Sequence, residues 1–114
     1  MDSEHRTIIV KGIPASSGTA EGIARLLLPG RDSFDAFNDG DILVTTLTDP
    51  TMVHAMIKAV AIVTDAGGIT SHPAILSREM GIPCVVNTKQ ATILIKDGMR
   101  VAVDGTKGEV YALD

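Results

Sequence analysis

The 114-residue sequence has no Trp, one Tyr, two Phe and one Cys. The single cysteine, Cys84, cannot form an internal disulfide and adds nothing to a zinc site. With so few aromatic residues, the core must be built from aliphatic side chains, and hydrophobic residues do make up 45% of the chain. This length and composition predict that residues 1–114 form one packed α/β domain with buried strands.

An excess of basic residues is missing as well. Ten Lys and Arg face 14 Asp and Glu, which gives a net charge of −4. Nucleic acids and anionic lipids bind to clusters of Lys and Arg, so neither is an expected partner. The sequence has no apolar run near the roughly 20 residues that span a bilayer, and no leader-like segment at its start. We therefore expect a cytoplasmic protein that binds no membrane.

Several common motifs of cofactor and catalytic sites are absent. No two of the three histidines, His5, His54 and His72, have the spacing of metal ligands, so we expect no metal held by this chain. Neither the dinucleotide fingerprint nor the Walker A pattern occurs, which argues against a nucleotide site in this domain. The Gly-x-Ser-x-Gly pattern of serine hydrolases is missing too, and no pair of carboxylates is placed for acid–base catalysis.

Seven segments have the patterns of β-strands. They are residues 7–11, 19–28, 41–45, 60–64, 84–86, 99–104 and 109–113. Residues 12–18 are rich in Gly, Pro and Ser and are expected to form an ordered loop, while Gly22 marks a bulge or a close backbone approach. The last two strands predict a hairpin, and residues 91–95 fit both a helical turn and a strand.

Three segments are predicted to be helical. A short helix is expected after Asp32, and the third helix covers residues 74–80 and stops at Gly81. Between them, residues 48–50 (TDP) predict the start of an amphipathic helix that joins two strands as a βαβ unit. The positions expected on the apolar faces of the three helices are Phe34, Phe37, Met52, Val53, Met56, Ile57, Leu76 and Met80.

Residues 65–73 (DAGGITSHP) link a strand to a helix and carry a histidine. A strand that passes through Gly67 and Gly68 into a helix N-terminus leaves backbone N–H groups without partners, and such groups hold anions. The positive end of the helix favours a neutral imidazole at His72, and the same end would hold a phosphoryl group attached to it. His72 is thus a candidate phosphoryl acceptor, although an ordinary histidine at a helix start is the simpler interpretation for an arbitrary sequence.

Three further side chains are candidates for the same site. Thr70 and Ser71 either donate hydroxyl groups to the phosphate or cap the helix. Arg78, two turns along, either balances the charge of the phosphate or lies on the surface as an ordinary arginine. The residues by themselves leave each pair of alternatives open.

Residues 67–86 (GGITSHPAILSREMGIPCVV) resemble the signature of the mobile, swivelling phosphohistidine domain of PEP-utilising enzymes, as in phosphoenolpyruvate synthase and pyruvate phosphate dikinase. Similar segments cover nearly the whole chain: residues 12–16, 40–44, 48–50, 61–65, 97–98 and 103–105, with Gly18 and Gly22. Many members of the family have alanine where Pro73 and Ser77 stand, and glycine where Asn87 stands. These departures leave the subfamily open.

The resemblance implies the family's three-layer β/β/α fold and phosphorylation of His72. It implies that ATP and Mg²⁺ bind to a partner domain, and that another domain carries a PEP/pyruvate-type or different acceptor. The chain would be the phosphohistidine part of a dikinase-type phosphotransferase, incomplete on its own, either excised from a larger enzyme or encoded as a separate subunit. The alternative is a non-catalytic docking or regulatory module that keeps the fold.

Overall fold

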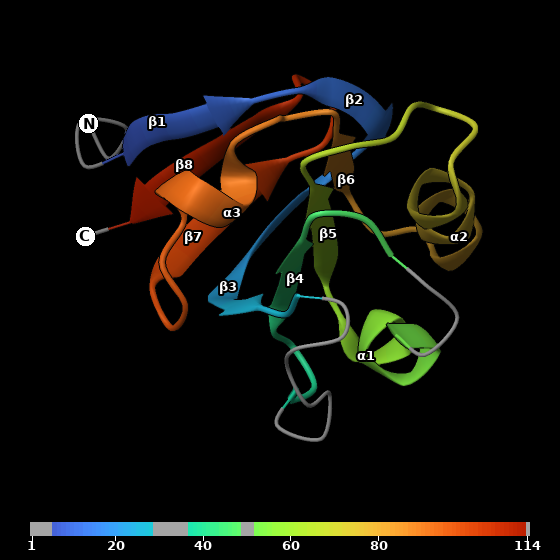
Figure 1. Ribbon diagram of the computed structural model, residues 1–114, viewed down its shortest axis with the longest axis horizontal. Coiled ribbons are helices and arrows are strands. Elements are labelled where there is room, and N and C mark those ends of the chain that lie inside the picture. The colour runs from blue at the N-terminus through green and yellow to red at the C-terminus, as the bar shows by residue number, and fades with distance from the viewer. Residues whose placement is uncertain (1–5, 29–36, 49–51, 114) are drawn as a thin grey trace.

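The computed structural model describes residues 6–28, 37–48 and 52–113, and these contain eight strands and three helices (Figure 1). The strands are β1 (Arg6–Lys11), β2 (Ile13–Ser16), β3 (Thr19–Leu26), β4 (Ile42–Thr45), β5 (Ala61–Thr64), β6 (Cys84–Val86), β7 (Arg100–Asp104) and β8 (Glu109–Leu113). The helices are α1 (Val53–Lys58), α2 (His72–Met80) and α3 (Ala91–Leu94). None of the helices in these residues is long and apolar enough to cross a membrane.

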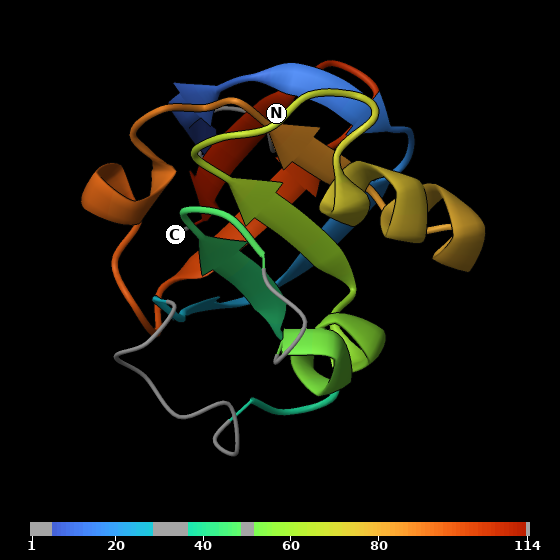
Figure 2. The ribbon, with the colours of Figure 1, turned by 45° about the vertical axis from the view of Figure 1, so that its right-hand side comes forward.

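The strands form one mixed sheet in the order β1-β8-β7-β3-β4-β5-β6-β2. Strands β1, β8, β7 and β3 are antiparallel, whereas β3, β4, β5 and β6 run parallel to one another. Strand β3 therefore belongs to both halves, and the sheet folds over so that its two halves face each other (Figures 1 and 2). The unit β4-α1-β5 is the predicted parallel βαβ unit.

Two apolar clusters hold the halves and the helices together. In β4, Ile42 and Val44 enter the cluster between the two halves of the sheet, while Leu43 enters the cluster beneath α1 and α2. In β5, Val63 enters the cluster between the two halves of the sheet, and Ile62 enters the cluster beneath the helices. Buried on both faces, these strands can only be continuous apolar runs. The resulting order of sheet, sheet and helices confirms the predicted three-layer β/β/α fold.

The prediction of a loop at residues 12–18 was wrong, because β2 occupies part of this segment and pairs with β6. Strand β2 lies at the edge of the sheet, where Pro14 is tolerated although it lacks an N–H group. Gly12 precedes it because a Cβ atom there would lie 2.4 Å from the Val86 carbonyl oxygen. The expected close approach at Gly22 is confirmed: a Cβ atom would lie 2.7 Å from the Gly40 oxygen.

The helices agree with the sequence only in part. On α1, Met56 is buried as expected, but Val53 and Ile57 are exposed because Ala55 occupies the packed face. Residues 91–95, which fitted two structures, contain the short helix α3. On α2, Leu76 packs against the helical cluster, whereas Met80 is only half-buried. The start of the expected helix after Asp32 lies outside the described residues, as do residues 49 and 50 of the helix start predicted at residues 48–50.

Candidate functional site

The loop of residues 65–71 leaves the carboxyl end of β5 and leads into α2 (Figure 2). Its first residues continue the pairing with the segment after β4: the N–H of Asp65 donates to the Thr45 oxygen at 3.1 Å, and that of Ala66 to the Thr46 oxygen at 3.0 Å. The Thr64 hydroxyl also donates to the Ala66 oxygen at 2.6 Å. The base of the loop is thus fixed to the parallel half of the sheet.

A tight turn between Gly68 and Ser71 shapes the middle of the loop. Both the N–H and the hydroxyl group of Ser71 donate to the Gly68 oxygen, at 3.0 and 2.6 Å. Ser71 stands at the N-cap position of α2, but its hydroxyl group makes no cap hydrogen bond to the helix. Gly67 has φ +109°, and a Cβ atom there would lie 3.1 Å from Ser71 Oγ, so the turn needs glycine.

Four successive amides of this loop make no hydrogen bond within the described part of the chain. They belong to Gly67, Gly68, Ile69 and Thr70. His72 follows as the exposed first residue of α2, where the N–H groups of the first turn also have no partner inside the helix. Pro73 costs nothing at this position, because its missing N–H would have been one of these groups. The arrangement is that of an anion site beside an accessible imidazole.

Arg78 connects three parts of the structure at the site. From α2, its Nη1 donates to the Ala15 oxygen of β2 at 2.8 Å and its Nη2 to the Ile69 oxygen of the loop at 2.7 Å. These bonds hold the loop against the helix that follows it. The sequence suggested either a phosphate partner or a surface arginine for this residue, and neither alternative included a bond to the loop backbone.

Sequence reasoning also missed the role of Asp65. Its carboxylate accepts hydrogen bonds from the N–H of Thr92, at 3.0 Å, and from the Thr92 hydroxyl, at 2.5 Å. Thr88 adds a bond from its hydroxyl to the Thr64 oxygen at 2.9 Å. The bonds join the loop to α3. The position of Asp65 directly after an apolar strand could have marked it as a candidate site residue. Its partner Thr92, however, lies 27 positions away in the sequence and has no pattern that links it to Asp65.

Burial makes Cys84 a poor nucleophile. It lies in β6 within the helical cluster, and burial raises the pKa of its thiol to about 11. The nearby Ser77 hydroxyl and the charge of Arg78 oppose this rise, although Ser77 Oγ makes no hydrogen bond of standard geometry. Cys84 is thus a free cysteine that packs as a small buried residue.

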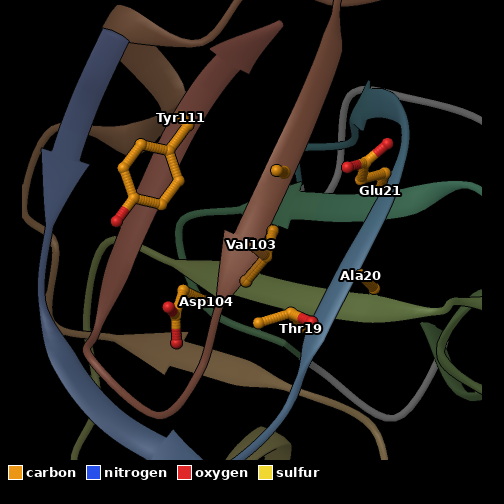
Figure 3. Close-up of a pocket in the computed structure, with 7 residues that line it drawn as sticks. Thr19, Ala20, Glu21, Val103, Asp104 and Tyr111 are labelled. Carbon is orange, nitrogen blue, oxygen red and sulfur yellow. The ribbon is translucent and has the colours of Figure 1, made fainter. Parts of the chain in front are cut away.

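Two cavities occur away from His72. One, of about 240 Å³, lies on the face of β3, β7 and β8, and Glu21, Asp104 and Tyr111 are among the residues that line it (Figure 3). The other, of about 390 Å³, lies between β2 and the end of α2 and is lined in part by Arg78. Among the described residues, no group of three or more His, Cys, Asp or Glu could hold a metal ion. Neither cavity is lined by His72, which is exposed at the start of α2.

Sequence comparisons with known proteins agree on one family. The profile described as "PEP-utilising enzyme, mobile domain" matches residues 37–108. Phosphoenolpyruvate synthase of Pyrococcus furiosus is 55% identical over 108 residues, which cover 95% of this chain and 13% of that protein. Rifampicin phosphotransferase of Bacillus cereus is 44% identical over 104 residues, which cover 91% of this chain and 12% of that protein.

The structural comparison points in the same direction. A solution structure of Enzyme I superposes with a TM-score of 0.59 and 30% identity, over 69% of this chain and 33% of that chain. The chain spans only about one eighth of the length of the phosphoenolpyruvate synthase that it matches, since it covers 13% of it. The similarity therefore concerns one domain of much longer proteins.

Proposed function

Because the chain belongs to the family of PEP-utilising enzyme mobile domains, we propose that residues 1–114 form a single phosphohistidine domain that carries a phosphoryl group on His72. The group comes from ATP, bound with Mg²⁺ at a partner domain, and passes to pyruvate, as in phosphoenolpyruvate synthesis, or to another acceptor. This domain itself holds no cofactor. It acts as the phosphohistidine part of a dikinase-type phosphotransferase.

The observation that carries the proposal is the combination of an exposed imidazole with four unpartnered amides just before it. A nucleophile inside its own cavity would serve one substrate that diffuses to it. A nucleophile on a projecting loop can instead enter two different active sites in turn. The amides then hold the phosphate oxygens while the group is in transit.

The transfer itself is a displacement at phosphorus. A neutral imidazole nitrogen of His72 attacks, the P–N bond forms, the P–O bond to the donor breaks, and the leaving oxygen takes the electron pair. The reverse attack by an acceptor oxygen breaks the P–N bond. Gly67, Gly68 and Thr70 supply backbone N–H groups around the phosphate, and Thr70 adds its hydroxyl group. Ser71, whose N–H and hydroxyl group both donate to the Gly68 oxygen, supports the turn, and Arg78 supports the loop by holding the Ile69 oxygen.

The proposal is tested by labelling the chain from ATP. The donor is the ATP-binding domain of the Pyrococcus furiosus phosphoenolpyruvate synthase, supplied with Mg²⁺ and ATP labelled in its phosphates. The wild-type chain is expected to take up an acid-labile, alkali-stable label. His72→Ala should take up none, while His54→Ala, which changes an exposed histidine of α1, should be labelled normally.

Two results would overturn the carrier role. One is a stable label on His72→Ala. The other is a wild-type chain that stays unlabelled yet binds the donor domain as tightly as His72→Ala does. The second result would establish the alternative, a docking or regulatory module that keeps the fold.

A further inference from the structure

The larger of the two cavities, which the proposed function does not use, has a lining that suits an anion. It measures about 390 Å³ and lies between β2, the C-terminal end of α2 and the turn that joins β7 to β8. The described residues that line it include one cation, Arg78, and no carboxylate. They also include three side chains with hydroxyl groups, those of Ser16, Ser17 and Thr106.

Two of these hydroxyl groups have a proton available for a ligand. Ser16 is only 7% exposed, and its hydroxyl group makes no hydrogen bond within the described part of the chain. An unpartnered polar group in such a position costs free energy, so a partner for it inside the cavity would stabilise the structure. The Thr106 oxygen accepts a hydrogen bond from the N–H of Gly18 at 3.0 Å, which leaves its own proton free to be donated.

Arg78 supplies the positive charge of the cavity. A guanidinium group has five N–H donors in one plane. Two of them are used in this chain, by the Ala15 oxygen at 2.8 Å and the Ile69 oxygen at 2.7 Å. The other three suit the oxygens of a phosphate group, which arginine binds through paired hydrogen bonds.

The carboxylate nearest in sequence to Thr106 is engaged with the backbone. The Oδ1 atom of Asp104 accepts hydrogen bonds from the N–H groups of Thr106 and Lys107, both at 3.0 Å. These bonds also fix the turn that carries the Thr106 hydroxyl group. The aspartate therefore shapes this side of the cavity without lining it.

Gly105 allows the turn after β7 to approach β2. A Cβ atom at Gly105 would lie 1.9 Å from the backbone oxygen of Ser16 and 2.9 Å from the backbone nitrogen of Cys84. The N–H of Gly105 donates to the Gly18 oxygen at 2.8 Å. A larger residue would push Thr106 away from β2, so close backbone packing holds the hydroxyl groups of the two segments around one space.

We propose that this cavity binds a phosphate group, either as inorganic phosphate or as part of a small phosphate monoester. One arginine and three hydroxyl groups, with no carboxylate beside them, favour an oxyanion over a cation or an apolar molecule. A volume of about 390 Å³ lies within the range of about 300–1,000 Å³ that is usual for ligand pockets, so a small organic group attached to the phosphate also has room.

This site is distinct from the amides before His72, and it goes beyond the proposed function without depending on it. The two sites share Arg78, which lines the cavity and also donates to the Ile69 oxygen of the loop. An anion in the cavity would therefore contact the same side chain that holds the loop.

The binding test follows the backbone amides of the whole chain by NMR during a titration with inorganic phosphate at constant ionic strength. The signals of Ser16, Ser17, Gly105 and Thr106 should shift and reach saturation, with a dissociation constant of about 1 mM or lower. Glycerol 3-phosphate and glycerol are titrated in the same way. Tighter binding of glycerol 3-phosphate than of phosphate would identify a monoester site, and equal or weaker binding would identify a site for the inorganic ion.

Variants separate the cavity from general attraction of anions to the surface. Ser16→Ala/Ser17→Ala should weaken phosphate binding about tenfold, because two hydroxyl donors to a charged ligand are lost. Arg78→Lys, which keeps the charge but not the planar group of donors, should weaken it as well. Lys107→Ala is the control, since Lys107 is an exposed cation next to Thr106 that does not line the cavity. It should bind phosphate as the wild type does, and the amide spectra show whether each variant is folded.

Several results would overturn the inference. Amides around the cavity that do not shift would do so, as would equal shifts with glycerol alone. Equal weakening by Lys107→Ala and Ser16→Ala/Ser17→Ala would indicate an adventitious ion only. Shifts confined to residues 67–72 would also overturn it, but they would support the proposed anion site beside His72. Conversely, a chain that binds phosphate in the cavity but is not labelled from ATP would keep this inference while the proposed function fails.

Discussion

Gly67 and Gly68 stand next to each other in the loop, yet they meet different requirements. Gly67 has a φ of +109° and faces Ser71 closely, whereas Gly68 has nothing within 4 Å of the position where a Cβ atom would stand and an ordinary φ. The sequence predicted a glycine turn before the helix, but it gave no sign of which glycine the turn requires. That distinction depends on the position of Ser71, which only the folded loop fixes.

A pair of alanine substitutions separates the two roles. Gly67→Ala should lower the free energy of unfolding by about 1–2 kcal/mol, because it forces a left-handed conformation on a residue with a side chain. Gly68→Ala should leave it unchanged within about 0.5 kcal/mol or raise it slightly. Urea unfolding followed by circular dichroism measures both. Equal losses in the two variants would contradict the loop geometry.

The backbone conformation at Asn87 explains why this residue can stand where many members of the family have glycine. Many members of the family have glycine at this position, and in this chain Asn87 has a φ of +58°. Asparagine is one of the few residues with a side chain that adopts this left-handed conformation readily. Lys89 also has a positive φ, of +71°, and nothing in its residue type predicts it.

The buried thiol of Cys84 makes stability depend on pH in the alkaline range. Its pKa is raised to about 11 from the ordinary value of 9.0, so the unfolded chain loses the thiol proton at a lower pH than the folded chain does. The stabilising contribution is complete below pH 9 and is lost as the pH rises from 9 to 11. The urea midpoint of the wild-type chain should therefore fall more steeply over this window than that of Cys84→Ala. Parallel pH profiles would contradict the assignment.

Single side chains connect the helices and strands around the site. Arg78 joins α2 to β2 and to the loop, and Asp65 joins the end of β5 to α3. Neither connection follows from local patterns, because each partner is distant in sequence. Strand β2 was missed for a related reason: Pro14 and the flanking Gly12 and Gly18 are typical of loops, and only the pairing with β6 makes this segment an edge strand.

The bond from Arg78 to the loop can be tested by hydrogen exchange. Removing the guanidinium in Arg78→Ala should loosen the loop. The Ser71 amide, which donates to the Gly68 oxygen, reports on the loop. This amide should exchange about ten times faster or more, because hydrogen bonds from a charged donor are worth about 1.5–3 kcal/mol. Glu79→Ala, at the adjacent exposed position of α2, is the control and should leave this amide unchanged. Equal exchange in both variants would show that Arg78 does not hold the loop.

The whole molecule places the loop that carries His72 on a buried base. The parallel strands β4 and β5 are buried on both faces, so the loop grows from the most enclosed part of the sheet, while His72 itself remains exposed. If His72 is the carrier, as proposed, this base keeps the loop geometry constant while the domain moves from one active site to the next. Neither of the two cavities described above includes His72 among its lining residues.

Much of this architecture could be predicted from the sequence, for physical reasons. Buried parallel strands must be continuous apolar runs, so β4, β5 and β6 were recognisable, and the family resemblance supplied their three-layer arrangement. Helix α1 was expected in this segment, but its buried face was predicted only in part, because the six-residue helix packs through Ala55 as well as through Met56. What stayed hidden was the set of long-range polar bonds of Asp65 and Arg78, since these depend on tertiary structure.

The most direct test of the account is to locate the phosphate on the intact chain. After incubation with the donor domain, ATP and Mg²⁺, the chain would be isolated at alkaline pH and fragmented by electron transfer in a mass spectrometer, which preserves labile phosphoramidates. We expect the added mass of one phosphoryl group on His72 and on no other residue. A phosphate on His54, Thr70 or Ser71, with His72 unmodified, would contradict the claim that His72 is the carrier.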